Sequence, residues 1–215
     1  MSGRWILIVA IVGLASSWVG TDATADEYKY VGAKKCGKCH KKELMGNQLA
    51  EWKKAPHSKA YETLKSDKAL EIAKERNLSA SPHESDDCLK CHVTAHGAPE
   101  SAFLKKPLKI TDSIQCESCH GPGSGYRKKK TMSDRDKSIA AGMWEPGKDD
   151  KICAKCHNDE SPTWDPAEGF DYEKGKEEIA HSIPEDVKGH YLELEKEQRA
   201  ARKAAGGADN DDDDD

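Results

Sequence analysis

The sequence has little apolar material from which to build a protein core. Only 36% of its 215 residues are hydrophobic and 6% are aromatic, with just two Phe, whereas 34% are charged. A chain this polar buries too little apolar area to offset the conformational entropy that it loses on folding. We therefore expect the fold to depend on something besides the polypeptide.

Several functional classes lack their usual signals. Lys and Arg are spread through the chain and the formal net charge is −5, with much of the excess acid in the C-terminal tail, so nothing indicates nucleic-acid binding. The glycine-rich run from Gly121 to Gly125 has neither a Gly-Lys-Ser/Thr ending nor a preceding strand, which excludes a phosphate-binding loop. No combination of acid, base and nucleophile indicates a catalytic site made of side chains alone.

Cysteine, in contrast, is abundant and regularly placed. All eight cysteines fall in four copies of Cys-x-x-Cys-His, the attachment motif of a c-type haem. In this motif two thiols three positions apart reach the two vinyl groups of one haem edge, and the next residue places its imidazole beneath the iron. The predicted cofactors are therefore four haem c groups. The attachment cysteines are Cys36, Cys39, Cys88, Cys91, Cys116, Cys119, Cys153 and Cys156, and the proximal iron ligands are His40, His92, His120 and His157.

Paired cysteines also occur in zinc ribbons, in redox dithiols and in disulfide frameworks. None of these three kinds of site requires a His after the second Cys every time. With nine His in 215 residues, four such coincidences would arise by chance on the order of a few times in a million. We favour four covalent haems, which would also supply the missing core, and we expect the apoprotein to be largely unfolded.

Residues 1–25 read as a signal peptide. A positive start at Arg4 is followed by an apolar run from Trp5 to Ala15 and by Ala23-Thr24-Ala25, a small-residue cleavage site. The alternative is an uncleaved anchor, but the run from Trp5 to Gly20 is shorter than the ~20 residues that span a membrane. We expect a periplasmic or extracellular protein without membrane association after cleavage, because c-type haems are attached outside the cytoplasmic membrane.

Residues 26–205 are expected to form a single, mainly α domain, a small multihaem cytochrome c fold in which short helices surround four haems with little or no sheet. The apolar spacing between Lys41 and Leu64 predicts two short helices with a break at Pro56. Ser66 is placed to cap a helix that runs to Leu78.

Further along, the segment between the second and third motifs is expected to be a loop or at most a small hairpin, with an extended stretch from Leu108 to Ile110. Pro184 is expected to open the last helix. Residues 206–215 form an acidic tail that repels itself and is predicted to be disordered.

The second axial ligand of each iron separates a carrier from a catalyst, because an iron without a sixth protein ligand can bind a substrate. Five histidines remain after the proximal ones are assigned, enough for four bis-His haems with one to spare. Two His ligands give a lower potential than His with Met, so we predict a low-potential carrier. The distal candidates are His57, His83, His96, His181 and His190.

The motifs and their surroundings resemble the tetrahaem cytochrome c-554 family. That family is known for carrying electrons from hydroxylamine oxidoreductase in ammonia oxidation, through three bis-His haems and a five-coordinate haem at the second motif. The matching stretches are Lys34-Lys35-Cys36, Trp52-x-x-x-x-His57-x-x-Ala60, Asp87 to Val93, Cys116 to Gly123, and Phe170-Asp171 placed before His181.

The resemblance implies roles for particular histidines. His57 resembles the distal ligand of the fourth-motif haem, and His181 that of the third-motif haem. His190, just before Tyr191, matches a His-Tyr pair and is either a supporting residue or a spare ligand.

The sixth ligand of the first haem differs from the family pattern. Where the family has a distal His, this chain has Lys130, with Met132 close by. Either another residue reaches the first iron, His96 being the first choice, or Met, Lys or water ligates it. His96 is also placed to close or line the pocket of the second-motif haem.

Two main functions follow. The leading one is an exported electron carrier, a monomer or weak oligomer, between an oxidoreductase, hydroxylamine oxidoreductase-like by resemblance, and a downstream cytochrome or quinol-linked acceptor. The alternative is a haem enzyme that reduces nitric oxide or another small nitrogen oxide at an open haem, with His83 or His96 as proton donor. A third hypothesis is a subunit of a haem-wired polymer or larger complex that lends a His to its neighbour.

Overall fold

The computed structural model describes residues 28–206. The predicted signal peptide and the acidic tail beyond Gly206 lie outside these residues. The described chain consists of short helices joined by turns and loops, and its extended pairing is limited to one isolated parallel bridge between Tyr30 and Phe103. The prediction of a mainly α protein with little sheet is confirmed.

Each of the four motifs begins in a helix of its own. They are α1 (Ala33–His40), α5 (Asp86–His92), α6 (Cys116–His120) and α9 (Lys151–Ala154). In helical backbone, residues three and four positions apart lie on the same face. Each motif therefore presents two thiols and one imidazole on one side of a single helical turn, and after α9 the turn continues because His157 N donates to Cys153 O at 3.0 Å.

The break at Pro56 is confirmed. The segment forms η1 (Glu43–Met45), α2 (Gln48–Lys54), η2 (Pro56–Lys59) and α3 (Ala60–Thr63). Ala55 is extended, with φ −68° and ψ 149°, because a residue that precedes proline is sterically disfavoured from the helical region. The two short helices expected here are α2 and α3.

The next helix, α4 (Asp67–Glu75), begins where the sequence predicts and ends early. The Ser66 side chain accepts a hydrogen bond from Ala69 N at 3.2 Å, which caps the helix. Asn77 then adopts a left-handed φ of 54°, and Leu78 N donates to Ala73 O at 2.9 Å. This closing turn is the Schellman motif, and it ends the helix three residues before Leu78.

Between α5 and α6 the chain has only the short turns η3 (Glu100–Ala102) and η4 (Ile110–Asp112). The expected loop is confirmed, but the extended stretch from Leu108 to Ile110 is wrong, since Ile110 opens η4. Backbone pairing occurs instead at the other end of the loop, where Tyr30 N donates to Ala102 O and Leu104 N donates to Tyr30 O.

The C-terminal part contains α7 (Lys129–Met132), α8 (Arg135–Ala140), α10 (Tyr172–Glu178) and α11 (Tyr191–Ala204). The last helix begins at Tyr191 and not at Pro184 as predicted. Gly189 has a left-handed φ of 79° and interrupts helical backbone, so residues 185–190 form turns, with Val187 buried at 2% exposure.

An ion-pair cluster anchors α11. The Glu195 carboxylate accepts hydrogen bonds from Lys42 Nζ at 2.9 Å and from the Tyr191 hydroxyl at 2.7 Å, and it pairs with Lys129. The side chain of Glu195 is only 12% exposed. The cluster joins the last helix to the segments after the first and third motifs.

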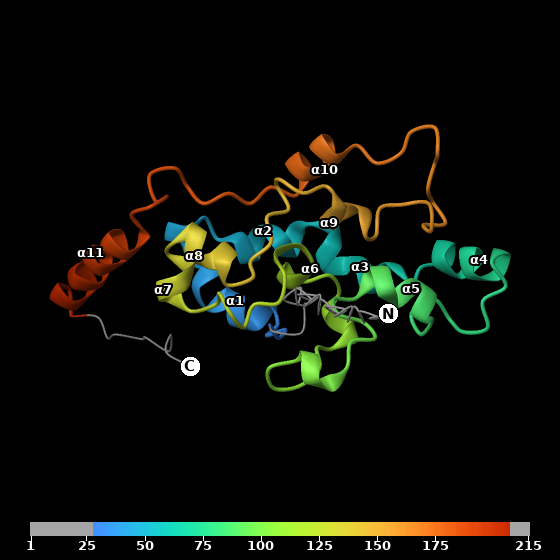
Figure 1. Cartoon of the computed structure of the whole chain (residues 1–215), viewed down its shortest axis with the longest axis horizontal. Helices are drawn as coiled ribbons and strands as arrows, with labels where there is room; N and C mark the ends of the chain where they lie inside the picture. The colour runs from blue at the N-terminus through green and yellow to red at the C-terminus, as the bar shows by residue number, and fades with distance from the viewer. Residues whose placement is uncertain (1–27, 207–215) are drawn as a thin grey trace, which may run out of the picture.

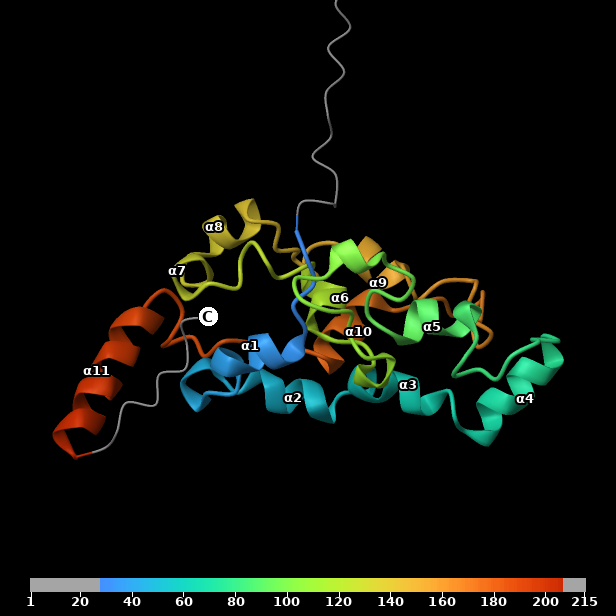
Figure 2. The same ribbon diagram turned by 90° about the horizontal axis from the view of Figure 1, so that it is seen from below.

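The body is elongated, with α4 and α11 at opposite ends (Figure 1). Between them the motif-bearing helices follow one another along the long axis in the order α1, α6, α9, α5, and the view turned by 90° gives the same order (Figure 2). The first and second motifs thus lie at the two ends of the row, with the third and fourth between them.

The apolar core is small, as the composition predicts. One cluster of buried side chains, Tyr61, Leu64, Leu89 and Val93, packs α3 against α5. Within residues 28–206, no helix is long and apolar enough to cross a membrane.

Candidate haem-binding sites

The thiols of different motifs touch one another. None of the eight cysteines forms a disulfide, and all are half-buried. Cys36 of the first motif and Cys116 of the third are hydrogen-bonded, which raises the pKa of Cys36 and lowers that of Cys116. Likewise Cys156 of the fourth motif contacts Cys91 of the second, and burial together with this neighbour raises the pKa of Cys156 to about 12.

The third and fourth motifs are also neighbours. Burial raises the pKa of Cys119 to about 11, and the nearby Cys153 thiol adds to the effect. The neighbouring thiols therefore place the motifs in the order first, third, fourth, second, which agrees with the row of helices in Figures 1 and 2.

Two pairs of histidine rings lie opposite each other with the same distance between ring centroids. The ring centroids of His57 and His157 are 6.0 Å apart with an interplanar angle of 86°, and those of His120 and His181 are 6.0 Å apart at 81°. With metal–nitrogen bonds of about 2.0 Å and about 1.1 Å from nitrogen to ring centre, two imidazoles on opposite sides of one metal have centroids roughly 6 Å apart. The two pairs fit a bis-His haem iron, and they are the two pairings that the resemblance implies.

In three of the predicted iron-binding histidines, a hydrogen bond made by Nδ1 orients the ring. Nδ1 of His181 lies 2.8 Å from Ile179 O, Nδ1 of His92 lies 2.7 Å from Ala60 O, and Nδ1 of His40 lies 3.2 Å from the Gln48 side-chain oxygen. Because each partner is a carbonyl oxygen, Nδ1 carries the proton and donates it. Nε2 is then the unprotonated nitrogen, the one that binds a metal.

Burial favours the neutral form of the imidazole rings. It lowers the pKa of His120 to about 4, with a further contribution from the neighbouring His181. Burial also lowers the pKa values of His40, His57 and His157. Neutral imidazole is the metal-binding form, so these four side chains are in the right state at neutral pH. The ring of His157 also stacks on Phe170, with centroids 4.3 Å apart.

A haem iron needs few protein ligands, since the porphyrin supplies four nitrogens. In the described part of the chain, no group of three or more His, Cys, Asp and Glu side chains converges as a metal site. The facing pairs of His are the arrangement that suits iron already held in a porphyrin.

The third motif contains a residue that sequence reasoning missed. Glu117 lies between the two cysteines and is 0% exposed. Its carboxylate accepts hydrogen bonds from Val31 N at 2.9 Å, Gly32 N at 2.7 Å and Gly123 N at 2.7 Å. Burial raises the pKa of Glu117, and the backbone donors act in the opposite direction. The side chain ties the segment before α1 to the loop after α6.

The turn after the third motif packs against protein rather than lying free. Gly121 has a φ of 77°, and a Cβ there would approach the Trp144 indole to 2.9 Å. The Tyr126 hydroxyl donates to His120 O at 3.0 Å and to Gly121 O at 2.7 Å. These hydrogen bonds hold the backbone of His120, a predicted proximal ligand, in place.

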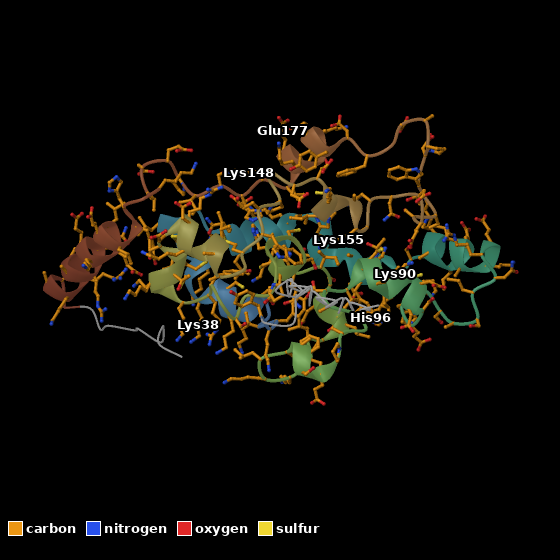
Figure 3. All side chains as sticks on the ribbon, viewed as in Figure 1. Lys38, Lys90, His96, Lys148, Lys155 and Glu177 are labelled. Carbon is orange, nitrogen blue, oxygen red and sulfur yellow. The ribbon has the colours of Figure 1, made fainter. Side chains whose placement is uncertain are left out.

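The remaining histidines have different surroundings. Nε2 of His96 is 2.7 Å from Asp86 Oδ1, and in Figure 3 His96 lies apart from Lys38, a residue of the helix that ends at His40. His190 has a 68% exposed side chain 3.5 Å from Glu193, and the Nδ1 atom of His83 is buried without a hydrogen-bond partner.

Lys130 and Met132 are the two further candidate ligands of the first haem iron. Lys130 is exposed, and Met132 Sδ accepts a hydrogen bond from the Ser138 hydroxyl at 3.8 Å. The structure brings none of His96, Lys130 and Met132 into a described contact with His40, and the assignment of that ligand stays a prediction.

Known proteins match the part of the chain that contains the first three haem motifs. Residues 35–121 match the family described as cytochrome c554 and c-prime. Cytochrome c-554 of Nitrosomonas europaea is 32% identical over 152 residues, which cover 65% of this chain and 63% of that relative. The chain thus aligns with less than two thirds of the relative's length. No solved structure matches the chain.

The matched region contains the first three motifs, and the wider alignment extends the likeness over most of the chain. The cofactor is haem c, and the four motifs correspond to four haems. With its row of Cys-x-x-Cys-His helices and its facing histidine pairs, the chain is similar to the cytochrome c-554 family over this region.

Proposed function

We propose that the protein is an exported tetrahaem electron carrier. It takes electrons from an oxidoreductase, hydroxylamine oxidoreductase-like by resemblance, and passes them to a downstream cytochrome or quinol-linked acceptor. Cleavage of residues 1–25 releases it as a monomer or weak oligomer into the periplasm or the extracellular space. Each haem, when bound, stores one electron reversibly.

The chain's own residues have defined tasks in this proposal. The cysteine pairs attach the haems, and His40, His92, His120 and His157 ligate the irons from the proximal side. His57 and His181 take the distal positions of the fourth and third haems. Two His ligands hold the potential low, which suits a protein that delivers electrons to a cytochrome with His and Met ligands.

The observation that carries the proposal is the row of motifs. The neighbouring thiols order them first, third, fourth, second, and the helices follow the same order along the long axis. A carrier with different donors and acceptors needs redox sites that connect two regions of its surface. A row with distinct ends supplies that arrangement.

An anaerobic stopped-flow experiment tests the proposal. The reduced protein is mixed with an oxidised soluble cytochrome c, and the electrons delivered per chain are counted from the absorbance of the acceptor. We expect close to four electrons per chain. The alternative function, nitric oxide reduction at an open haem, is tested in parallel with an electrode for nitric oxide and excess reductant. Sustained nitric oxide consumption together with slow or incomplete delivery to the cytochrome would replace the carrier by the enzyme.

A further inference from the structure

A basic loop projects from the body between α5 and α6, below the row of motif helices in Figure 1. Its outer part, here called the 104–110 loop, reads Leu-Lys-Lys-Pro-Leu-Lys-Ile. Leu104 is 38% exposed and Ile110 42%, and both are among the few large apolar side chains on the described surface. Lys105, Lys106 and Lys109 are exposed, and none of them has an ion-pair partner within residues 28–206.

The 104–110 loop is held firmly at its base. Leu104 N donates to Tyr30 O at 3.0 Å, and the rings of Phe103 and Tyr30 lie 5.8 Å apart, with Phe103 buried. Leu108 points inward, its Cδ2 atom 3.1 Å from the position that a Cβ on Gly32 would take. The exposed side chains are therefore presented on a fixed support, which lowers the entropy lost when a partner binds.

The same contacts place the 104–110 loop beside the first motif. Gly32, which Leu108 covers, immediately precedes α1, and its carbonyl accepts a hydrogen bond from Cys36 Sγ at 3.8 Å. Lys34 and Lys41, at the two ends of α1, are also exposed. Lys38, between them, points to the lower side of the body in Figure 3, where the loop projects.

We propose that the 104–110 loop, together with Lys34 of α1 and Lys41 just after it, is the docking surface for a redox partner whose contact face is acidic. The inference rests on the proposed function and names the end of the row at which that partner binds. Electron-transfer complexes have small interfaces, in which charge steers the encounter and a few apolar contacts hold it. Leu104 and Ile110 supply the apolar contacts, and the lysines supply the charge.

An anionic membrane would also attract three lysines. A protein partner is favoured because the loop is in contact with the segment that carries Cys36. Docking there brings the partner close to the first redox site, whereas lipid binding gains nothing from that position.

The test compares two charge-reversal variants of the haem-loaded protein. K105E/K106E/K109E alters the 104–110 loop. K53E/K68E/K74E changes the net charge equally at exposed lysines of other segments, which also have no ion-pair partner among residues 28–206. The probe is a reduced plant-type ferredoxin, an acidic one-electron donor, and the measurement is its second-order reaction rate by stopped flow.

Electrostatic steering changes association rates by about 10- to 10³-fold. We therefore expect the loop variant to react at least about tenfold more slowly than the wild type at low ionic strength, and the control variant to change less than about threefold. In about 1 M salt, where the Debye length falls to about 3 Å, the three proteins should react at similar rates.

Three outcomes would overturn the proposal. Equal slowing of both variants would mean that net charge alone acts. A wild-type rate that does not depend on salt would mean that charge does not steer the encounter. An unchanged ferredoxin rate, with loss of the loop variant's cosedimentation with phosphatidylglycerol vesicles, would assign the loop to a membrane surface.

Electron counting by dithionite titration separates this proposal from the proposed function. If the wild type takes up four electrons and returns them to cytochrome c while the ferredoxin rates fail the test, only the docking surface is wrong. If the wild type cannot be reduced and reoxidised, the carrier function itself fails.

Discussion

Replacing His57 by Ala should change the coordination of one haem and leave the other three unaltered. The His57 ring faces that of His157 at 6.0 Å, close to the roughly 6 Å expected for two imidazoles on one metal with bonds of about 2.0 Å. Alanine removes the whole imidazole, so if His57 is the predicted distal ligand, the fourth-motif iron should lose it and become high-spin. One of four haems is a quarter of the iron.

Electron paramagnetic resonance of the oxidised protein measures this fraction. Relative to wild type, His57→Ala should add a high-spin signal near g of about 6 that integrates to about a quarter of the iron. His181→Ala should add another quarter through the iron on His120, and the double variant should add both, because the two pairs are separate. His190→Ala is the matched control, since its side chain is 68% exposed, and it should add nothing.

The reasoning fails if His57→Ala leaves the spectrum unchanged after correct haem loading is confirmed. It fails equally if His190→Ala produces the quarter signal and His57→Ala does not, since His190 would then hold the distal position assigned to His57.

Three further predictions concern stability. Burial alone would raise the pKa of Glu195, but hydrogen bonds from lysine and tyrosine side chains lower it to about 2, so its stabilisation is complete above about pH 4.5 and is lost as the pH falls through 2. Glu195→Gln should destabilise α11 by about 1 kcal/mol at pH 7, less than the full pKa shift corresponds to, because solvent screens this half-buried carboxylate. Hydrogen exchange of the α11 amides measures the loss of stability, and an undiminished difference from wild type at pH 2 would contradict the prediction. Glu117→Gln places an amide NH₂ against backbone donors and should lower the free energy of unfolding, measured by chemical denaturation, by about 1–3 kcal/mol. Glu84→Gln, at an exposed site, is the control and should leave this free energy unchanged. Gly125→Ala brings a Cβ into collision with Ala141 O and the Tyr28 ring and should lower stability by about 1–3 kcal/mol; an unchanged melting temperature would show that the segment moves aside.

Local chemistry made much of the fold predictable. The break at Pro56 and the cap at Ser66 depend on residues next to one another in sequence, and both are confirmed. The start of the last helix was misjudged because Pro184 is a good first residue for a helix, whereas the left-handed Gly189 outweighs it. The extended stretch from Leu108 was wrong because short apolar alternation occurs in turns as well as strands.

The haem sites also have parts that the sequence predicts and parts that it does not. The haem motifs are contiguous, so their cysteines and proximal histidines are visible in the sequence alone. The partners of His57 and His181 lie far away along the chain, and spacing contains no information about them; the family resemblance suggested them, and the ring geometry agrees. Glu117 was missed because a single carboxylate between two cysteines gives no sign that backbone donors from two other segments surround it.

The central claim is that each of the four motifs holds one haem c. The most direct test is to purify the exported protein and to measure covalently bound haem per chain by the pyridine haemochrome absorbance, with iron and zinc from the same sample by elemental analysis. The claim predicts four haems and four irons per chain without zinc, and three haems when both cysteines of one motif are replaced by Ser. Fewer than four haems in the wild type, or zinc in place of iron, would contradict it.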